Sequence, residues 1–191
     1  MTHPLDLFQS WFAQAEAAQV PQPEAMALAT ATPDGRPSLR FVLYRGRSGN
    51  GLRFFTNYQS RKADELFANP VAAGTFYWQQ PLARQVRLEG SVERLDDAQS
   101  DEYFASRPRG SQLAAWASPQ SQPFPYAALE ARYAELEREY AGRPVPRPPH
   151  WGGFLLVPSR VELWEGLEHR LHKRVLYVAG PSGWTASELG P

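Results

Sequence analysis

The chain has 191 residues, of which 42% are hydrophobic and 21% are charged, and this size and composition fit one globular domain rather than a disordered chain. Its 20 basic residues balance 20 acidic ones, which argues against a broad surface for binding DNA or RNA. Cysteine is absent, so disulfides, thiolate-bound metals and a cysteine nucleophile are excluded.

Residues 1–20 predict an amphipathic helix, because Leu5, Phe8, Phe12 and Ala15 recur at helical spacing. The segment does not resemble a signal peptide, since it lacks a basic start and acidic residues interrupt its apolar stretch. The chain has no run of about 18 apolar residues that would span a membrane. We therefore expect a cytoplasmic protein.

Short strands joined by tight turns follow this helix. We predict strands at residues 25–32, 38–45, 52–57, 71–79 and 84–95. Asp34-Gly35 between the first two is a strong hairpin signal, and a short helix begins near Ser60 and ends before Asn69-Pro70. Because too few residues separate the strands for repeated parallel crossovers, the pattern predicts a mainly β, small antiparallel barrel with flanking helices.

Residues 96–141 are predicted to be helical. Asp96 or Asp97 caps a helix that reaches Phe104, and a short helix at 111–117 follows. A third, longer helix carries one apolar stripe, made of Tyr126, Leu129, Tyr133, Leu136 and Tyr140. Such a stripe is typical of a contact with the core or with a partner helix.

The Pro-rich segment 142–150 ends this helix. Further strands are expected at 152–157, 160–166 and 174–178, with a short one at 183–187. The Pro-rich segment is compatible with an interdomain linker. We favour a rigid crossover that returns residues 151–191 to the same barrel, because so short a segment would barely bury a core of its own. The prediction is a single domain over residues 1–191.

The start of the short helix, Ser60-Arg61-Lys62, is the most informative local feature. Ser60 is a favourable N-cap, but two cations in the first turn oppose the positive end of the helix dipole. An anion bound there would remove the conflict, because backbone N–H groups, the dipole and both cations would converge on it. The alternative is an ordinary pair of solvated charges. The pattern favours a phosphate site.

A second basic cluster, which contains Arg107, Arg109, Ser106 and Ser111, lies beside the start of a predicted helix and also suits a small anion. Eighteen of the 20 basic residues are Arg. This excess has two possible explanations. One is codon bias, and the other is a need for forked guanidinium donors that hold phosphate or carboxylate. The sequence lacks the motifs of a Rossmann site, a P-loop or a hydrolase nucleophile elbow.

A third cluster, at residues 164–174, holds two His, two Arg and one Lys between two predicted strands. A metal shared by His169 and His172 is disfavoured, because no third ligand stands at zinc-type spacing. In an extended segment, Arg170, His172 and Arg174 would instead form one cationic face that suits an anionic substrate.

Together these segments resemble the pyridoxine/pyridoxamine 5′-phosphate oxidases. The family's motifs are matched in order by RFVLYR, FFTN followed by SRK, RQVRLEG, YFxSRPRxSQ, the QS of SPQSQ, WGGF and ELWEG…HRLHKR, from about Phe8 to Pro191. The resemblance implies an antiparallel split β-barrel that forms a homodimer, with FMN at the subunit interface. It also implies oxidation of pyridoxine or pyridoxamine 5′-phosphate to pyridoxal 5′-phosphate, with oxygen as final acceptor and hydrogen peroxide as product.

The resemblance also implies a set of site residues, none of them a metal ligand. FMN would be bound by Arg40, Phe41, Val42, Leu43, Arg45, Phe55, Thr56, Arg61, Lys62, Gln85, Gln120, Ser121, Trp164 and Arg174. The substrate would be held by Arg45, Tyr103, Arg107, Ser111, Arg170 and His172. Hydride would pass from the substrate's 4′ carbon to the flavin. Arg170 and His172 would be the catalytic residues that position this carbon, with His172 able to relay a proton.

The chain departs from the family pattern at five positions. Arg45 and Phe55 replace a usual Lys and Tyr, and Leu167 replaces Gly or a polar residue. Lys173 stands where Asp is usual and Glu188 where Arg is usual, which suggests an ion pair with exchanged signs. Two other functions stay open: a flavin oxidase of the same fold acting on another substrate, such as a phenazine-pathway intermediate, and a non-catalytic protein that binds FMN or pyridoxal phosphate.

Overall fold

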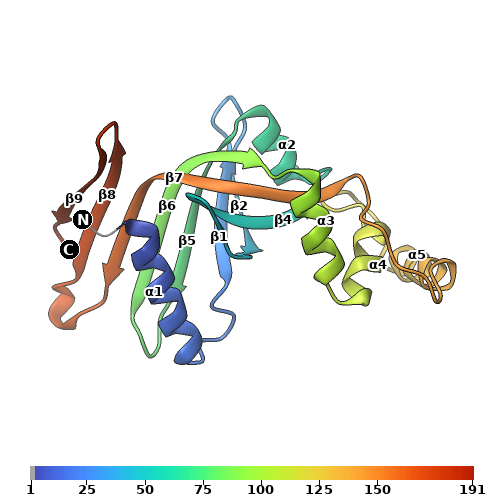
Figure 1. Cartoon of the computed structure of the whole chain (residues 1–191), viewed down its shortest axis with the longest axis horizontal. Coiled ribbons are helices and arrows are strands. Elements are labelled where there is room, and N and C mark those ends of the chain that lie inside the picture. Colours follow the sequence, from blue (N-terminus) through green and yellow to red (C-terminus); the bar gives the residue numbers. More distant parts are fainter. Residues whose placement is uncertain (1–2) are drawn as a thin grey trace.

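The structure, a computed structural model, describes residues 3–191 and centres on one antiparallel sheet (Figure 1). Its strands are β1 Ala25–Ala31, β2 Pro37–Leu43, β3 Arg47–Ser48, β4 Gly51–Asn57, β5 Val71–Trp78, β6 Arg84–Arg94, β7 Trp151–Glu165, β8 Lys173–Gly180 and β9 Gly183–Leu189. The order is β2-β1-β5-β6-β7-β4-β3, with β8 paired to β7 and β9 to β8. The predicted strands of the N-terminal half are confirmed, as is their antiparallel pairing.

The α-helices of the described residues lie around this sheet. They are α1 Pro4–Ala17, α2 Arg61–Ala68, α3 Asp97–Ser106, α4 Arg109–Ala117 and α5 Tyr126–Glu139. Figure 1 shows α3, α4 and α5 gathered at one end of the molecule and the β8–β9 hairpin at the other. Among residues 3–191, no helix is long and apolar enough to cross a membrane.

The chain after the Pro-rich segment forms one long strand, β7, where two separate strands were expected. The strand continues through Pro158 because the register of β6 shifts between Glu89 and Gly90, opposite the proline. Such a bulge tolerates the missing proline N–H. The β6 side of the bulge requires glycine, since a Cβ on Gly90 would lie 2.0 Å from the carbonyl oxygen of Val157.

β7 joins the two ends of the chain into one sheet. It pairs with β6 from Phe154 to Glu165, while its first part pairs with β4 and its last part with β8. Because β4 and β6 come from the N-terminal half, the last strands return to the same sheet. The Pro-rich segment thus leads from α5 into a strand of the sheet that the N-terminal half forms.

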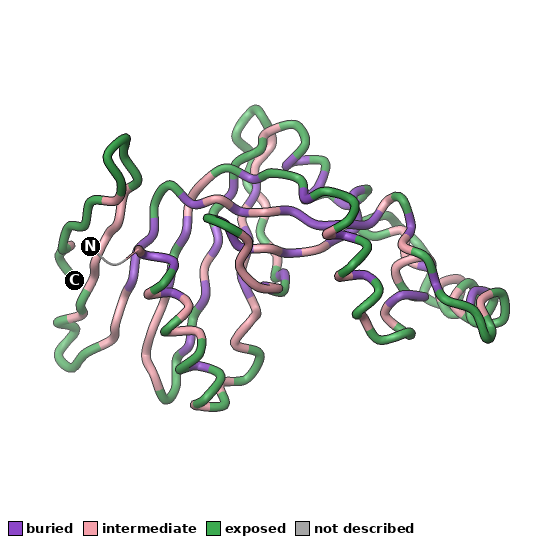
Figure 2. Tube along the Cα trace, viewed as in Figure 1, coloured by how far each residue is buried: buried purple, intermediate pink, exposed green. Residues whose placement is uncertain are grey.

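The inner face of the sheet and α1 form the main core. Alternate residues of β1, β5 and β6 are buried (Figure 2), and α1 contributes Leu5 and Phe8, both fully buried. Phe8 packs against Phe76 with 5.0 Å between the ring centroids. The predicted amphipathic helix is thus confirmed over Pro4–Ala17, with residues 1–2 of the prediction outside the described chain. Burial of each such side chain contributes about 1.5–3 kcal/mol to stability.

The helices of residues 97–139 enclose a second, smaller core. It is made of Phe104, Leu113, Ala117, Leu136, Val145 and Trp151. The Asp96 carboxylate accepts a hydrogen bond from Gln99 N at 2.7 Å and caps α3, as predicted. Of the predicted stripe, Tyr126 is exposed, whereas the other four residues contact this core: Leu129, Tyr133, Leu136 and Tyr140.

The outer face of the sheet carries exposed apolar side chains at the β2 edge. Leu39, Phe41 and Leu43 alternate along β2 with 69%, 75% and 40% of their surface exposed, and Tyr77 on β5 is exposed as well. The same face bears linked Arg–Glu ion pairs on β6 and β7. A sheet face with this much exposed apolar surface is typical of an interface.

Candidate active site

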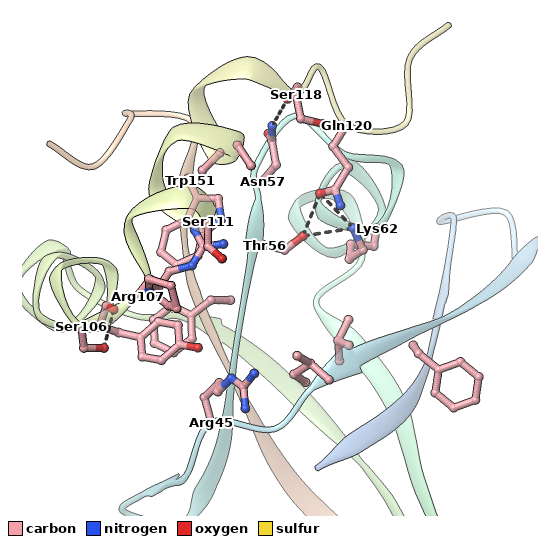
Figure 3. Close-up of a pocket in the computed structure, with 18 residues that line it drawn as sticks. Arg45, Thr56, Asn57, Lys62, Ser106, Arg107, Ser111, Ser118, Gln120 and Trp151 are labelled. Carbon is pink, nitrogen blue, oxygen red and sulfur yellow. Dashed lines mark hydrogen bonds between the residues drawn. The ribbon is translucent and has the colours of Figure 1, made fainter. Parts of the chain in front are cut away.

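A cavity of about 590 Å³ opens between β2, β4 and helices α3 and α4 (Figure 3). The predicted site residues that line it are Phe41, Val42, Leu43, Arg45, Phe55, Thr56, Lys62, Tyr103, Arg107, Ser111 and Gln120. Asn57, Ser118 and Trp151 also line it; they were not predicted, although Trp151 opens the WGGF motif and Asn57 ends FFTN. Ser121 was predicted, but it is exposed and lies outside the cavity wall.

The buried ammonium of Lys62 lies at one end of the cavity. Its Nζ donates to Thr56 Oγ1 at 3.0 Å and to Gln120 Oε1 at 3.5 Å (Figure 3), and also to Ser60 Oγ at 2.9 Å. These partners are neutral. Burial, reinforced by repulsion from Arg40, lowers the pKa of Lys62 to about 8. A buried ammonium that only neutral oxygens hold is well suited to bind an anion.

The start of α2 differs from the prediction in two respects. Ser60 occupies the N-cap position without capping through its side chain, and its hydroxyl instead donates to Asn57 O at 2.7 Å. Arg61 is largely exposed and outside the cavity wall, and its Nε donates to Glu65 Oε1 at 2.9 Å. The two cations therefore do not converge on one point, because Lys62 faces the cavity and Arg61 is paired with Glu65.

Arg40, which was predicted to contact FMN, lies beside α2 and outside the cavity wall. Its guanidinium donates to Thr30 Oγ1 at 2.6 Å and to Glu65 Oε2 at 3.3 Å. Burial lowers the pKa of Arg40, although its bonds to Glu65 oppose that change. Since Arg40 also depresses the pKa of Lys62, it adds positive potential at that end of the cavity.

Arg107 and Ser111 form another part of the cavity wall, away from Lys62 in Figure 3. Tyr103 lines the cavity as well. The guanidinium carbon of Arg107 lies 4.6 Å from the centroid of the Trp151 ring. Its Nη1 is buried and has no hydrogen-bond partner among the described residues, and burial lowers the pKa of this arginine. A buried donor without an acceptor is costly, so this end of the cavity also suits an anion.

Five predicted site residues lie in another part of the chain. Gln85, Trp164 and Arg174 stand opposite one another in one row across β6, β7 and β8. The His172 ring lies 4.7 Å from that of Trp164, and Arg170 is exposed two residues before it. None of these five described residues lines the cavity. Within one chain, the predicted site is therefore divided into two parts.

The loop at residues 166–172 is not the extended segment that the sequence predicted. Glu168–Arg170 form a 3₁₀ turn, and His169 and Arg170 have φ angles of 57° and 60°. Non-glycine residues in this region of backbone space are strained. Because the regular strand begins only after His172, the expected single cationic face of alternating residues does not form.

The suggested ion pair between Lys173 and Glu188 is also absent from the described chain. Lys173 stands opposite Glu165 on β7, and the Glu165 carboxylate is bound by Arg84 at 3.3 Å. Glu188 stands opposite Val175 on β8. The exchange of signs at these two positions therefore does not create a direct pair within one chain.

Comparison with known proteins places these residues in a family. Residues 12–139 match the family described as pyridoxamine 5′-phosphate oxidase, and residues 151–191 match the pyridoxine 5′-phosphate oxidase C-terminal dimerisation region. The chain belongs to the pyridoxine/pyridoxamine 5′-phosphate oxidase family. Proteins of that name from Bordetella petrii and Rubrobacter xylanophilus are each 53% identical to it over 98% of this chain and over 89% and 87% of their own lengths. The resemblance of the motifs is thus confirmed.

Solved structures show the same fold as this family member. PhzG from Burkholderia lata, in complex with tetrahydrophenazine-1-carboxylic acid, superposes with a TM-score of 0.95 at 34% identity, over 100% of this chain and 94% of its own. A pyridoxamine 5′-phosphate oxidase-related, FMN-binding protein from Nostoc punctiforme has a TM-score of 0.77 at 23% identity, over 96% of this chain and 97% of its own. The predicted antiparallel split β-barrel with flanking helices is confirmed.

Proposed function

We propose that this chain is an FMN-dependent oxidase that converts pyridoxamine and pyridoxine 5′-phosphate to pyridoxal 5′-phosphate, with oxygen reduced to hydrogen peroxide. The observation that carries the proposal is one cavity with two separate cations, Lys62 and Arg107, neither of which has an anionic partner among the described residues. A phosphorylated cofactor and a phosphorylated substrate would each supply one anion. Relatives at 53% identity over nearly the whole chain bear the corresponding name.

The residues around Lys62 fit the phosphate of FMN. Lys62 faces the cavity without an anionic partner among the described residues and would donate to the phosphate directly. Arg40 and Arg61, which share the carboxylate of Glu65, would add positive potential beside it. The first backbone N–H groups of α2 add further donors at the same point. When bound, the flavin would supply the acceptor for a hydride from the substrate's 4′ carbon.

The residues around Arg107 fit the phosphate of the substrate. Arg107 would gain an acceptor for its buried Nη1, and the hydroxyls of Tyr103 and Ser111 line the same part of the cavity. Arg45 lines the cavity between this part and Lys62 in the view of Figure 3. We assign Arg45 a contact with both ligands. Forked guanidinium donors suit both anions and would hold them in a fixed relation.

A second copy of the chain would complete the site. Five predicted site residues lie away from the cavity of their own chain, on or beside β6, β7 and β8: Gln85, Trp164, Arg170, His172 and Arg174. The exposed apolar residues of β2 and β5 are the surface that a two-fold partner would cover. Residues 151–191 match a dimerisation region, which supports a homodimer. In this arrangement the Trp164 row of one protomer would reach the Lys62 end of its partner.

His172 is proposed to donate a hydrogen bond to the reacting end of the substrate. Its Nδ1 accepts a hydrogen bond from Leu167 N at 3.1 Å, so the neutral ring carries its proton on Nε2. That leaves Nε2 as the nitrogen that would face the substrate. Arg170, exposed on the strained turn beside it, would cover the pyridine ring on the side away from the flavin.

One assay tests the proposed function. The purified protein is examined for bound flavin by its absorbance, and pyridoxamine 5′-phosphate is then added in air while pyridoxal 5′-phosphate and hydrogen peroxide are measured. We expect FMN to be retained and both products to form in equal amounts. Flavin-loaded protein without turnover would contradict the oxidase and favour a non-catalytic binding protein, whereas failure to bind FMN would contradict both.

A second candidate is an oxidase of the phenazine type, which the match to PhzG favours. The compound bound to PhzG is named as a carboxylic acid, whereas the proposed vitamer carries a phosphate. The same assay is therefore run with tetrahydrophenazine-1-carboxylic acid. Oxidation of this compound without oxidation of pyridoxamine 5′-phosphate would support the oxidase of the phenazine type and contradict the proposed pyridoxamine 5′-phosphate oxidase.

A further inference from the structure

The buried carboxylate of Glu65 has no part in the proposed reaction, yet it lies among the cations of the Lys62 end. Glu65 stands on α2, one turn after Arg61, and its side chain is 4% exposed. Its Oε2 accepts hydrogen bonds from Thr30, Ser38 and Arg40, and its Oε1 accepts one from Arg61. Sequence reasoning missed this residue, although the spacing of four from Arg61 is that of a helical ion pair.

These four donors connect three elements of the fold. Thr30 lies on β1, Ser38 and Arg40 lie on β2, and Arg61 lies on α2 itself. A carboxylate is retained in such a buried place only when its charge and hydrogen-bonding capacity are satisfied. Glu65 is therefore the point at which the first turns of α2 are attached to the edge of the sheet.

The charge of Glu65 also decides which cation stays available to a ligand. Glu65 binds Arg61 at 2.9 Å and Arg40 at 3.3 Å. Lys62, the residue that faces the cavity, has neutral partners only among the described residues. Two of the three cations are thus committed to Glu65, and the third is left for an anion.

The hydrogen bonds to Glu65 favour its charged form near neutral pH. Burial by itself raises the pKa of this carboxyl group, but the hydrogen bonds from Ser38, Thr30, Arg61 and Arg40 outweigh burial and lower the pKa to about 2. The contacts of Glu65 with both arginines are therefore present whenever the protein is folded near neutral pH.

We propose that Glu65 is a positioning residue of the FMN phosphate site: it holds Arg40, Arg61 and the first turn of α2 in place, so that Lys62 is presented to the phosphate. This inference rests on the proposed binding of FMN at the Lys62 end. Without the carboxylate, Arg40 would repel Lys62 without compensation across a poorly solvated space. The helix start would then move away from the sheet, and the phosphate would lose its donors.

The test compares binding of FMN and riboflavin to protein from which flavin has been removed. Both ligands carry the same ring and ribityl chain, but riboflavin has no phosphate, so the ratio of their dissociation constants reports the phosphate site alone. Quenching of flavin fluorescence at one salt concentration measures both. We expect Glu65→Gln to weaken FMN binding about tenfold or more and to change riboflavin binding less than about twofold.

Asp64 offers a matched control. It is the preceding residue on the same helix, is exposed, and forms no ion pair among the described residues. Asp64→Asn removes the same charge without removing a contact, and we expect it to leave FMN binding within about twofold. Glu65→Asp keeps the charge on a shorter side chain and is expected to recover part of the FMN affinity lost in Glu65→Gln.

Several outcomes would overturn the proposal. Equal weakening of FMN and riboflavin would show that Glu65 only maintains the fold, and unchanged or tighter FMN binding would exclude a positioning role. If circular dichroism shows that Glu65→Gln does not fold, the ratio of the FMN and riboflavin dissociation constants is measured for Glu65→Asp instead. Wild-type protein that binds riboflavin as tightly as FMN would instead contradict the proposed phosphate site, and this result appears before any substitution is made.

Discussion

Arg107 lies over the indole ring of Trp151, with 4.6 Å between the guanidinium carbon and the ring centroid. The stacking holds the guanidinium in the cavity wall, and its buried Nη1 has no acceptor in the described part of the chain. Arg107 is therefore oriented before any ligand binds. Because the donors are already fixed, binding a phosphate there costs little ordering of the side chain.

Replacing Arg107 by Lys is expected to impair use of the substrate much more than binding of FMN. Lysine keeps the charge but has neither the forked donors nor the planar group that stacks on Trp151. We expect kcat/KM for pyridoxamine 5′-phosphate to fall by about 10- to 100-fold, mainly through KM, while the dissociation constant of FMN is unchanged. Steady-state kinetics and flavin titration measure the two effects.

Arg109→Lys is the control for this substitution. Arg109 is exposed and donates to the backbone carbonyls of Arg143 and Tyr140, outside the cavity wall. Its replacement should leave kcat/KM within about twofold of the wild type. The assignment of the substrate phosphate to Arg107 is wrong if both substitutions have the same small effect.

FMN affinity is expected to fall as the pH rises above about 8. Burial, together with Arg40, lowers the pKa of Lys62 to about 8, whereas a bound phosphate favours the ammonium and raises this pKa. The free site thus loses a proton that the complex keeps, so each further pH unit weakens binding by up to about tenfold until the pKa of the complex is reached.

Titration of the protein with FMN from about pH 7 to pH 10 checks this dependence. Lys62→Arg provides the comparison, because arginine stays charged over the whole range. The wild type should show the fall in affinity and Lys62→Arg should not. A wild-type dissociation constant that is flat across the range would argue against contact between Lys62 and the phosphate.

Stability is expected to decrease in acid as Glu65 is protonated. The hydrogen bonds to Glu65 overcome the opposite effect of burial and lower its pKa from 4.5 to about 2. As the pH falls below 4.5, the unfolded chain takes up this proton before the folded one does, so the stabilisation is complete above pH 4.5 and is lost as the pH approaches 2.

Thermal unfolding of the wild type and of Glu65→Gln as a function of pH measures this contribution. The variant is expected to be less stable by roughly 3 kcal/mol at neutral pH, since it leaves Arg40 without its counter-ion. The two melting temperatures should converge towards pH 2. A difference that stays constant down to that pH would mean that packing, and not the charge of Glu65, stabilises the fold.

Two inactive variants are expected to restore each other's activity in mixed dimers. Lys62→Ala removes a cation from the cavity, and Arg174→Ala removes one from the row on β8 that the partner would supply. A mixed dimer contains one intact site and one site that carries both substitutions, so the isolated mixed dimer should have about half of wild-type activity. Co-expression with two different tags isolates the mixed dimer. Activity no higher than that of either variant alone would contradict a site shared between protomers.

The phosphate signal at the start of α2 shows how far local reasoning reaches. Cations in the first turn contradict the helix dipole, and this conflict can be read from Ser60-Arg61-Lys62 without any structure. The different places of Arg61 and Lys62 cannot be read in this way. They depend on the face of α2 that packs against β1 and β2, where Glu65 meets Thr30, Ser38 and Arg40. These partners stand 25 to 35 residues from Glu65 in the sequence.

By itself the sequence determined the strands, the hairpin at Asp34-Gly35, the cap at Asp96 and the motifs that identify the family. These features depend on neighbours within a few residues, so alternation, spacing and turn chemistry are enough to predict them. The tertiary structure decided that β7 is continuous, that Arg40 and Arg61 share one carboxylate, and that the predicted site residues fall into two groups. Each of these depends on contacts between residues far apart in the chain, which form only when the sheet closes and the packing of α2 selects the partners of each charge.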